Sequence, residues 1–539
     1  DHGGRWTPVT ATSARPLAGL GRVAVLGLCT CWGALVLVCV ASAALVTAVA
    51  RNIAMLYPSM EERIGYAVTA GASVPSAAFN GRGYGLTTLG GITAAEVGFM
   101  GQVLFPLVGV LAGVRLTRRE EEDGRVELLT ASRVGRLAPF AASAVLLAFT
   151  ALVTGAVMTA GMAVAGLPWR GSAWYSGAAG SCVFFFAAVG LVLAQLCQET
   201  RTAQQLGTGV VSAAFLVRFI IDGMQWGAVW ASPLGWLPEV RAFDGPRAWP
   251  LIAYGVGALL LLAVGCALCV RRDLGSGVLA PRPGPVRSPE RAVTPWRLAA
   301  GLERAATVVW TLLAVVWALL IGLFSEEVTR NVNANPTLLG AMGLTRGTDL
   351  MVQLAAVVIV ATAGAIAVQR AARLGAEESS GRLGALLSTR LARRRLWAGW
   401  WGTTLASCLV ALGAGALALA AGIWAVTGEK ASALVALQIA WGYAVPVVLI
   451  VAVESLLAAL GPRWHVAGWA LVVWTVVVGF LAGELRLSEW ARDLSVTHAV
   501  GVLPADDPDP RVIVAEGVTA LVLMAVAQWV FGRRDLRAG

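Results

Sequence analysis

Charged residues are scarce in this sequence, and their scarcity limits what the chain can be. Only 13% of the 539 residues are Asp, Glu, Lys or Arg, whereas 58% are hydrophobic and the mean hydropathy is +0.74. A soluble globular chain carries about 25% charged residues. The composition therefore excludes a soluble protein of this length and predicts a membrane protein.

Lysine and histidine are scarcer still, and each absence excludes a class of chemistry. Lys430 is the only lysine, and it follows Glu429 instead of the glycine that a Walker A loop requires. Any ATPase must therefore be another polypeptide. The three histidines lie in separate segments, without metal-ligand spacing or a nucleophile triad. We expect no catalytic residue, no metal and no cofactor in this chain.

Long apolar runs are what the sequence has in abundance. A helix needs about 20 mostly apolar residues to cross a bilayer. Twelve stretches qualify, at residues 22–50, 91–114, 138–165, 174–198, 207–229, 249–270, 305–325, 350–369, 397–426, 432–460, 466–482 and 511–532. The sequence predicts an all-α polytopic membrane protein with twelve transmembrane helices.

Basic residues orient these spans, because Lys and Arg stay on the cytoplasmic side during insertion. Most of the 41 basic residues lie on cytoplasmic segments when the N-terminus is placed inside, and Arg218 alone lies within a predicted span. We expect a multi-pass protein of the bacterial plasma membrane with both termini in the cytoplasm. The net charge of +10 then requires no nucleic acid as a partner.

Two motifs recur at nearly equal offsets. The run from Val270 to Leu274, which ends the sixth predicted span, recurs from Gly532 to Leu536 after the twelfth. The acidic Gly-Arg run that follows the second span recurs after the eighth, and Arg136 aligns with Arg393. Because each half has six spans, the sequence predicts two parallel six-helix repeats.

The motifs and composition divide the chain into four segments. They are a cytoplasmic N-terminal segment that can hold an elbow helix, 1–21; a first half with the charged loop 115–136, 22–274; a Pro- and Arg-rich cytoplasmic linker and elbow helix, 275–304; and a second half with the charged loop 370–395, 305–539.

The two charged loops are the most informative segments. In each, the glycine permits a turn that ends the incoming helix, and the residues after it can form a short amphipathic helix. The positive-inside rule does not explain the carboxylates, so their recurrence favours contact with a soluble partner over a solvated loop. The residues that we expect to make this contact are Glu120, Glu121, Glu122, Gly124, Arg125, Glu127, Glu377, Glu378, Gly381 and Arg382.

These loops resemble those of the two-half permeases of ABC exporters for polyketide antibiotics, the tetronasin-resistance type. The resemblance also includes Arg218-x-x-x-Asp222 and the run from Ser232 to Trp236. It implies an ABC-2 or G-subfamily fold, in which both loops are coupling helices that meet two copies of an ATP-binding subunit. ATP and Mg would bind to that partner. A segment that re-enters the membrane from outside would contain Ser232, Pro233, Gly235 and Trp236.

The second half departs from this pattern. Gly384 and Ala385 stand where the first half has Glu127 and Leu128. The resemblance therefore implies a weaker coupling contact in the second half.

Arg218 and Asp222 lie one turn apart in the fifth predicted span. A charge at membrane depth is costly and usually faces the bundle interior, so this pair either locks helix packing or contacts substrate or a gate. Aromatic residues of the fifth and eleventh spans could line a path, although those near span ends are more often interface anchors. The candidates for a translocation path or gate are Phe215, Arg218, Phe219, Asp222, Met224, Trp226, Trp474 and Phe480.

The leading hypothesis is the permease subunit of an ATP-driven exporter of hydrophobic or amphipathic compounds, for antibiotic or multidrug efflux. Its expected partners are the separate ATP-binding subunit, membrane lipid and a hydrophobic small-molecule substrate. The main alternative is a proton-driven transporter of the major-facilitator class. Such a protein is expected to carry Gly-x-x-x-Asp-Arg-x-Gly-Arg after its second span, whereas the run from Arg119 to Arg125 has its carboxylates massed before Gly-Arg. A membrane enzyme for lipid-linked sugars would need carboxylates or histidines on outer loops. The one dense outer cluster, Asp506, Asp507 and Asp509, lies among prolines.

Overall fold

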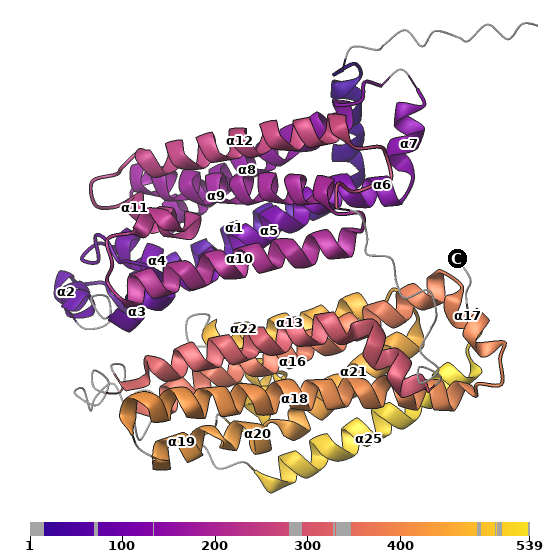
Figure 1. Ribbon diagram of the computed structural model, residues 1–539. Coiled ribbons are helices and arrows are strands. Elements are labelled where there is room, and N and C mark those ends of the chain that lie inside the picture. Colours follow the sequence, from indigo (N-terminus) through magenta and orange to yellow (C-terminus); the bar gives the residue numbers. More distant parts are fainter. Residues whose placement is uncertain are drawn as a thin grey trace, which may run out of the picture. The chain divides into compact units, whose positions relative to one another are not determined.

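All the regular structure that is described in this chain is helical (Figure 1). The computed structural model describes residues 16–68, 74–132, 134–279, 294–326, 329, 347–428, 430–481, 487–501, 503 and 509–536. Within these ranges, eleven helices are long and apolar enough to cross a membrane. The prediction of an all-helical polytopic membrane protein is confirmed to that extent.

The described helices account for eleven of the twelve predicted spans. The eleventh predicted span corresponds to α22 (His465–Leu481), which has 17 residues, whereas a bilayer crossing takes about 20. Residues 482–486, which follow α22, lie outside the described residues.

The chain divides into two compact units, Asp1–Gly284 and Pro285–Gly539. This division falls within the predicted linker 275–304, although 280–293 lie outside the described residues. The same holds for 1–15 of the predicted N-terminal segment and for Arg133 of the first charged loop.

Unit 1 is a helix bundle around α9 (Figure 1). Gly109 and Gly113 allow close approach to α9, because a Cβ at either position would collide with its backbone. Small residues at such contacts are typical of helices that pack in membranes. The long helices are α1 (Leu20–Leu56), α5 (Gly98–Val114), α8 (Ala138–Val164), α9 (Trp169–Leu196), α10 (Thr200–Gly223) and α12 (Trp249–Arg271).

Short helices cover the two ends of the unit 1 bundle (Figure 1). At one end, which we call the loop end, lie α6 (Glu120–Glu122) and α7 (Arg125–Thr130). The helices at the opposite end are α2 (Met60–Val68), α3 (Val74–Asn80), α4 (Leu89–Glu96) and α11 (Trp236–Glu239).

Unit 2 is built around α16 (Gly347–Ser379), which packs against α13 (Pro295–Leu323), α18 (Arg393–Thr427), α21 (Ala444–Leu460) and α22. This helix extends beyond the predicted span 350–369, so Arg370 lies inside it as a buried arginine that the sequence did not reveal. Its guanidinium donates to the hydroxyls of Thr307, Thr403 and Ser407.

The remaining helices of unit 2 include short ones near both ends. They are α17 (Arg382–Leu387), α19 (Lys430–Ala436), α20 (Gln438–Gly442), α23 (Glu489–Asp493), α24 (Val496–Ala499) and α25 (Pro510–Arg533). The end that carries α17 is the loop end of this unit.

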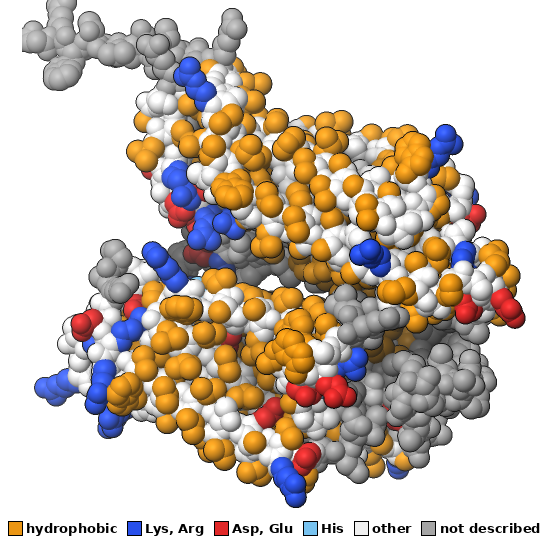
Figure 2. Space-filling view, turned by 180° about the vertical axis from the view of Figure 1, so that it is seen from behind, with side chains coloured by type: hydrophobic (Ala, Val, Ile, Leu, Met, Phe, Trp, Pro, Cys, Tyr) orange, Lys and Arg blue, Asp and Glu red, His pale blue; other side chains and the backbone are white. Residues whose placement is uncertain are grey.

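Hydrophobic side chains cover most of the surface of each unit that Figure 2 shows, and charged side chains gather chiefly toward the helix ends. Leu259 on α12 and Leu521 on α25, for example, expose 67% and 68% of their surface. A soluble protein rarely exposes apolar patches of this extent, whereas a lipid-facing surface requires them.

Candidate functional site

Both charged loops turn at a glycine. The helix α5 continues through a π-helical turn, Arg115–Arg119, into α6, and the chain then reverses at Gly124 with φ 74° before α7 begins. Gly381, also with φ 74°, separates α16 from α17. Positive φ is easily adopted only by glycine, which explains why a Gly-Arg step occurs in each loop.

Glu121 lies inside unit 1 and does not project from it. Its Oε1 accepts from Arg272 Nη1 at 2.7 Å and from the Gly275 N–H at 2.6 Å. Its Oε2 accepts from Arg272 Nη2 at 2.5 Å and from Arg118 Nη1 at 3.1 Å. This carboxylate therefore joins the loop after α5 to the end of α12.

Arginine side chains surround that contact. Arg118 is 1% exposed and also donates to the carbonyls of Gln198, Gly275 and Ser276. Arg272 donates to Gln195 Oε1 at 2.8 Å, and Arg136, just before α8, donates to the Arg272 carbonyl.

Unit 2 repeats the core of this arrangement. Glu378 Oε2 accepts from Arg534 Nη2 at 2.6 Å, so the loop after α16 is joined to the end of α25. Arg393, at the start of α18, donates to the Arg534 carbonyl at 2.8 Å. Glu377 is also buried, but its ion pairs with Arg373 and Arg382 stay within the loop region.

The other predicted loop residues are more exposed. Arg125 pairs with Glu120 at 2.7 Å and with Asp123 at 2.5 Å, on the surface of the loop. Glu122 accepts a hydrogen bond from the backbone N–H of Thr200, the first residue of α10. The helix dipole stabilises a negative charge at this N-terminus. Glu127 is exposed beside Leu128, which exposes 76% of its surface.

The ten predicted contact residues thus form two groups. Glu121, Glu377 and Glu378 face inward and hold parts of the chain together. A charge reversal at Glu121 or Glu378 would therefore disrupt a buried ion pair, whether or not a partner binds nearby.

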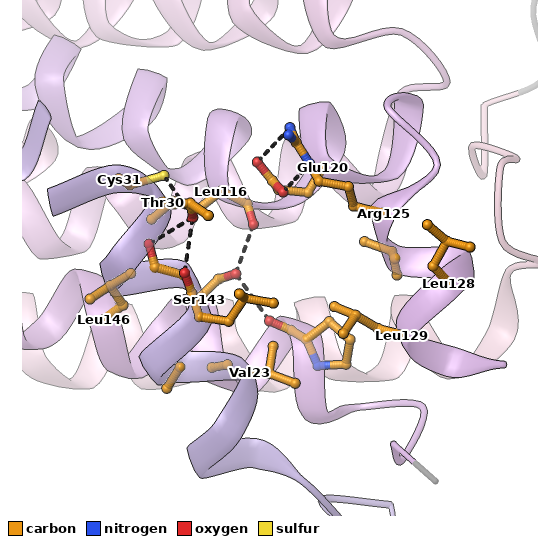
Figure 3. A pocket seen from close by; sticks show the side chains of 16 residues that line it. Val23, Thr30, Cys31, Leu116, Glu120, Arg125, Leu128, Leu129, Ser143 and Leu146 are labelled. Carbon is orange, nitrogen blue, oxygen red and sulfur yellow. Dashed lines mark hydrogen bonds and ion pairs between the residues drawn. The ribbon is translucent and has the colours of Figure 1, made fainter. Parts of the chain in front are cut away.

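A cavity of about 270 Å³ lies beneath α7 (Figure 3). Apolar side chains of α1, α7 and α8 line most of it, and the Glu120–Arg125 pair lies at one edge. No residue of α7 is buried. The helix α7 therefore makes few buried contacts with the bundle, whereas Glu121 nearby is held in the bundle by buried ion pairs.

At the opposite end of unit 1, Arg218 and Asp222 fasten α3 to α10. Arg218 Nη1 lies 3.5 Å from Asp222 Oδ2, and Arg218 Nη2 donates to the Phe79 carbonyl of α3 at 2.8 Å. Arg82, which the sequence did not single out, pairs with Asp222 at 3.0 Å. The geometry supports the packing-lock interpretation of this pair.

Phe215 and Phe219 are buried beside that network. The ring of Phe219 packs edge-on against Phe79 at 5.1 Å, and Phe215 packs against Phe99 at 5.8 Å. The Arg218 guanidinium lies over the Phe215 ring at 4.4 Å. These rings are part of the interior of unit 1.

The remaining path candidates are less buried, and the Trp226 carbonyl accepts a hydrogen bond from Arg82 of that network. Met224 and Trp226 are more than half exposed just after α10. On α22, Trp474 donates to the Ala491 carbonyl, and Phe480 is half-buried.

The segment from Ser232 to Trp236 is fixed between α10 and α12. Ser232 Oγ donates to the Ala214 carbonyl at 2.7 Å, and the Tyr254 hydroxyl donates to the Pro233 carbonyl at 2.6 Å. Gly235 is buried against the Val229 carbonyl, and Trp236 Nε1 donates to the Trp230 carbonyl.

Relatives of this chain are found among bacterial permeases. Residues 293–532 match the family described as the multidrug efflux system permease Rv1217c, C-terminal domain. The chain is also 30% identical over 447 residues to the multidrug efflux system permease protein Rv1217c of Mycobacterium tuberculosis (strain ATCC 25618 / H37Rv). That alignment covers 82% of this chain and 80% of the relative. The chain therefore belongs to the family of the multidrug efflux system permease Rv1217c.

Proposed function

We propose that this chain is the transmembrane subunit of an ATP-driven exporter of hydrophobic or amphipathic compounds, of the ABC-2 type and similar to the polyketide-antibiotic exporters. Family membership supports a transport role. The observation that carries the ATP-driven part is the pair of loops, each of which ends a long helix at a glycine and then presents a short helix, α7 or α17. Two copies of a separate ATP-binding subunit would dock there, with ATP and Mg bound to them.

We further propose that the protein has twelve spans in two parallel halves, with α22 as the eleventh span. The loop-to-last-helix contacts support this proposal, because Glu121 and Glu378, Arg272 and Arg534, and Arg136 and Arg393 are matched in the recurring motifs. The positive-inside rule would place both loop ends in the cytoplasm, where a soluble ATPase could reach them.

The two short helices offer different surfaces to such a partner. On α7 the exposed residues Glu127 and Leu128 form an acidic knob with an apolar tip, whereas α17 presents Gly384 and Ala385 at the corresponding place. An apolar side chain that enters a pocket of a partner can dominate the binding energy. We infer that the first loop provides the stronger docking contact.

The change Leu128→Ser is expected to weaken binding of the ATP-binding subunit about tenfold, since losing one such anchor costs about 1–2 kcal/mol. The melting temperature of the permease should stay the same, because Leu128 packs little within the chain. Affinity for the fluorescently labelled ATPase, measured with the permease in nanodiscs, checks this. Leu274→Ser, also an exposed leucine at the loop end of unit 1, is the matched control. Equal affinities of both variants for the ATPase would show that Leu128 does not contribute to docking.

One buried carboxyl favours a second candidate, the proton-driven transporter. Glu454 on α21 is fully buried against Gly468 of α22, and neither of its oxygens accepts a hydrogen bond from the described residues. A protonatable group inside a span is a frequent element of proton-coupled transport.

The change Glu454→Gln separates the two candidates. An ATP-driven exporter should retain its transport rate in this variant, because the proposed ATPase contact lies elsewhere. A proton-driven transporter should lose its response to a pH gradient. Transport of a hydrophobic dye into inverted vesicles, energised by ATP or by a pH gradient, distinguishes these outcomes.

A further inference from the structure

Two sets of side chains, one in each unit, connect the loop after the second span to the end of the last span. We call each set a clasp. The first clasp consists of Glu121, Arg272 and Arg136, and the second of Glu378, Arg534 and Arg393. In both, the glutamate of the loop forms an ion pair with the arginine at the end of the last helix. The backbone carbonyl of that arginine accepts a hydrogen bond from the third member of the clasp, Arg136 or Arg393.

The clasps are not needed merely to neutralise the loop glutamates. Glu377, the neighbour of Glu378, finds its arginine partners nearby in Arg373 and Arg382. Glu378 instead pairs with Arg534, 156 residues further along the chain. Buried ion pairs are weak contributors to stability compared with apolar packing, and their best-attested use is to fix one arrangement of elements.

The short helices α7 and α17 bury few residues against the bundle, so the clasps matter for transmitting motion from the loops. The helix α7 has no buried residue and lies over a cavity, and Leu383 alone of α17 is buried. A force on either helix would pass weakly through such packing. Besides the two spans that are covalently joined to each loop, the firm contact between the loop and the bundle is made by the adjacent buried glutamate.

We propose that the clasps are positioning pairs that make the end of α12 move with loop 115–136 and the end of α25 move with loop 370–395. This inference rests on the proposed function, in which an ATPase moves the loops. The last span of each unit then responds to ATP binding together with the two spans that carry the loop covalently.

The two clasps differ in strength. Glu121 accepts four hydrogen bonds, from Arg118, from both Nη atoms of Arg272 and from the Gly275 N–H. Glu378 accepts from Arg534, and its Oε1 receives no hydrogen bond from the described residues. The second clasp is therefore the one that opens more readily when a partner is changed.

Spin labels on both sides of the second clasp test the proposal. The labels are placed at the exposed positions Thr389 in the loop and Asp535 after α25, in the complete permease–ATPase complex in nanodiscs. The distance between them is measured without nucleotide and with a non-hydrolysable ATP analogue. In the otherwise native chain we expect the same narrow distribution in both states, because the two positions move together. In Glu378→Gln we expect a distribution about twofold broader with the analogue, since an open clasp samples a second arrangement.

Three further arms make the outcome decisive. The double exchange Glu378→Arg with Arg534→Glu should restore the narrow distribution. Phe531→Leu, which truncates a buried ring stacked on Trp397, should lower stability without broadening the distribution. A distance in the native chain that changes with the analogue, or broadening in Phe531→Leu equal to that in Glu378→Gln, overturns the proposal. Failure of the ATPase to copurify with the native chain would contradict the proposed function instead.

Discussion

The variant Glu121→Lys is expected to lose about 3–5 kcal/mol of stability, the range observed when one partner of a buried ion pair is removed. The new ammonium would lie beside Arg118 and Arg272, both nearly buried, with no carboxylate to accept their hydrogen bonds. The melting temperature of the purified permease, followed by tryptophan fluorescence in detergent, should fall by many degrees. Little of the protein should survive extraction at physiological temperature.

A matched change nearby shows that the effect depends on burial. Glu127→Lys makes the same charge change in the same loop, but Glu127 is exposed, so its stability should change by less than about 0.5 kcal/mol. If the two variants melted at the same temperature, Glu121 could not hold α12 to the loop as the structure indicates.

The second large effect is expected from Arg218→Met. This change leaves the buried Asp222 with Arg82 as its remaining ion-pair partner and removes the donors to the carbonyls of Ala77 and Phe79. Each unsatisfied buried group costs about 1–3 kcal/mol, so the end of α10 that carries Asp222 should release α3. We expect a lower melting temperature and faster hydrogen exchange in α3, measured by mass spectrometry.

Its control changes the other arginine that pairs with Asp222. Arg82→Gln alters a partly exposed arginine and leaves the Arg218–Asp222 pair in place, so it should be milder. Native melting behaviour in Arg218→Met, together with a changed range of exported compounds, would assign Arg218 to the translocation path and not to packing.

Much of the fold could be predicted from hydropathy, because a bilayer dictates the length and polarity of each span. Hydropathy could not show that α16 continues past Arg370, since three hydroxyl groups inside the bundle satisfy that guanidinium. A hydropathy average over a sequence window includes the charge of Arg370 but not the hydroxyl groups that accept its hydrogen bonds.

The position of each charged loop and its turn at glycine could be predicted, but which glutamates face the interior could not. In the run Glu120-Glu121-Glu122, nothing local distinguishes the buried glutamate from its two neighbours, because the π-helical turn before it sets which side faces inward. A signal was nevertheless present. The two recurring motifs, one acidic and one containing Arg-Arg-Asp, have opposite charge at the contact positions, and pairing them would have predicted Glu121 with Arg272 and Glu378 with Arg534.

Reconstituted transport tests the central claim most directly. The native chain and its ATP-binding subunit are placed together in liposomes, and uptake of a hydrophobic fluorescent dye is followed after ATP is added outside. Our account predicts uptake that requires both polypeptides and ATP and that persists when an ionophore collapses the proton gradient. Uptake by the chain alone, driven by a pH gradient and indifferent to ATP, would contradict it.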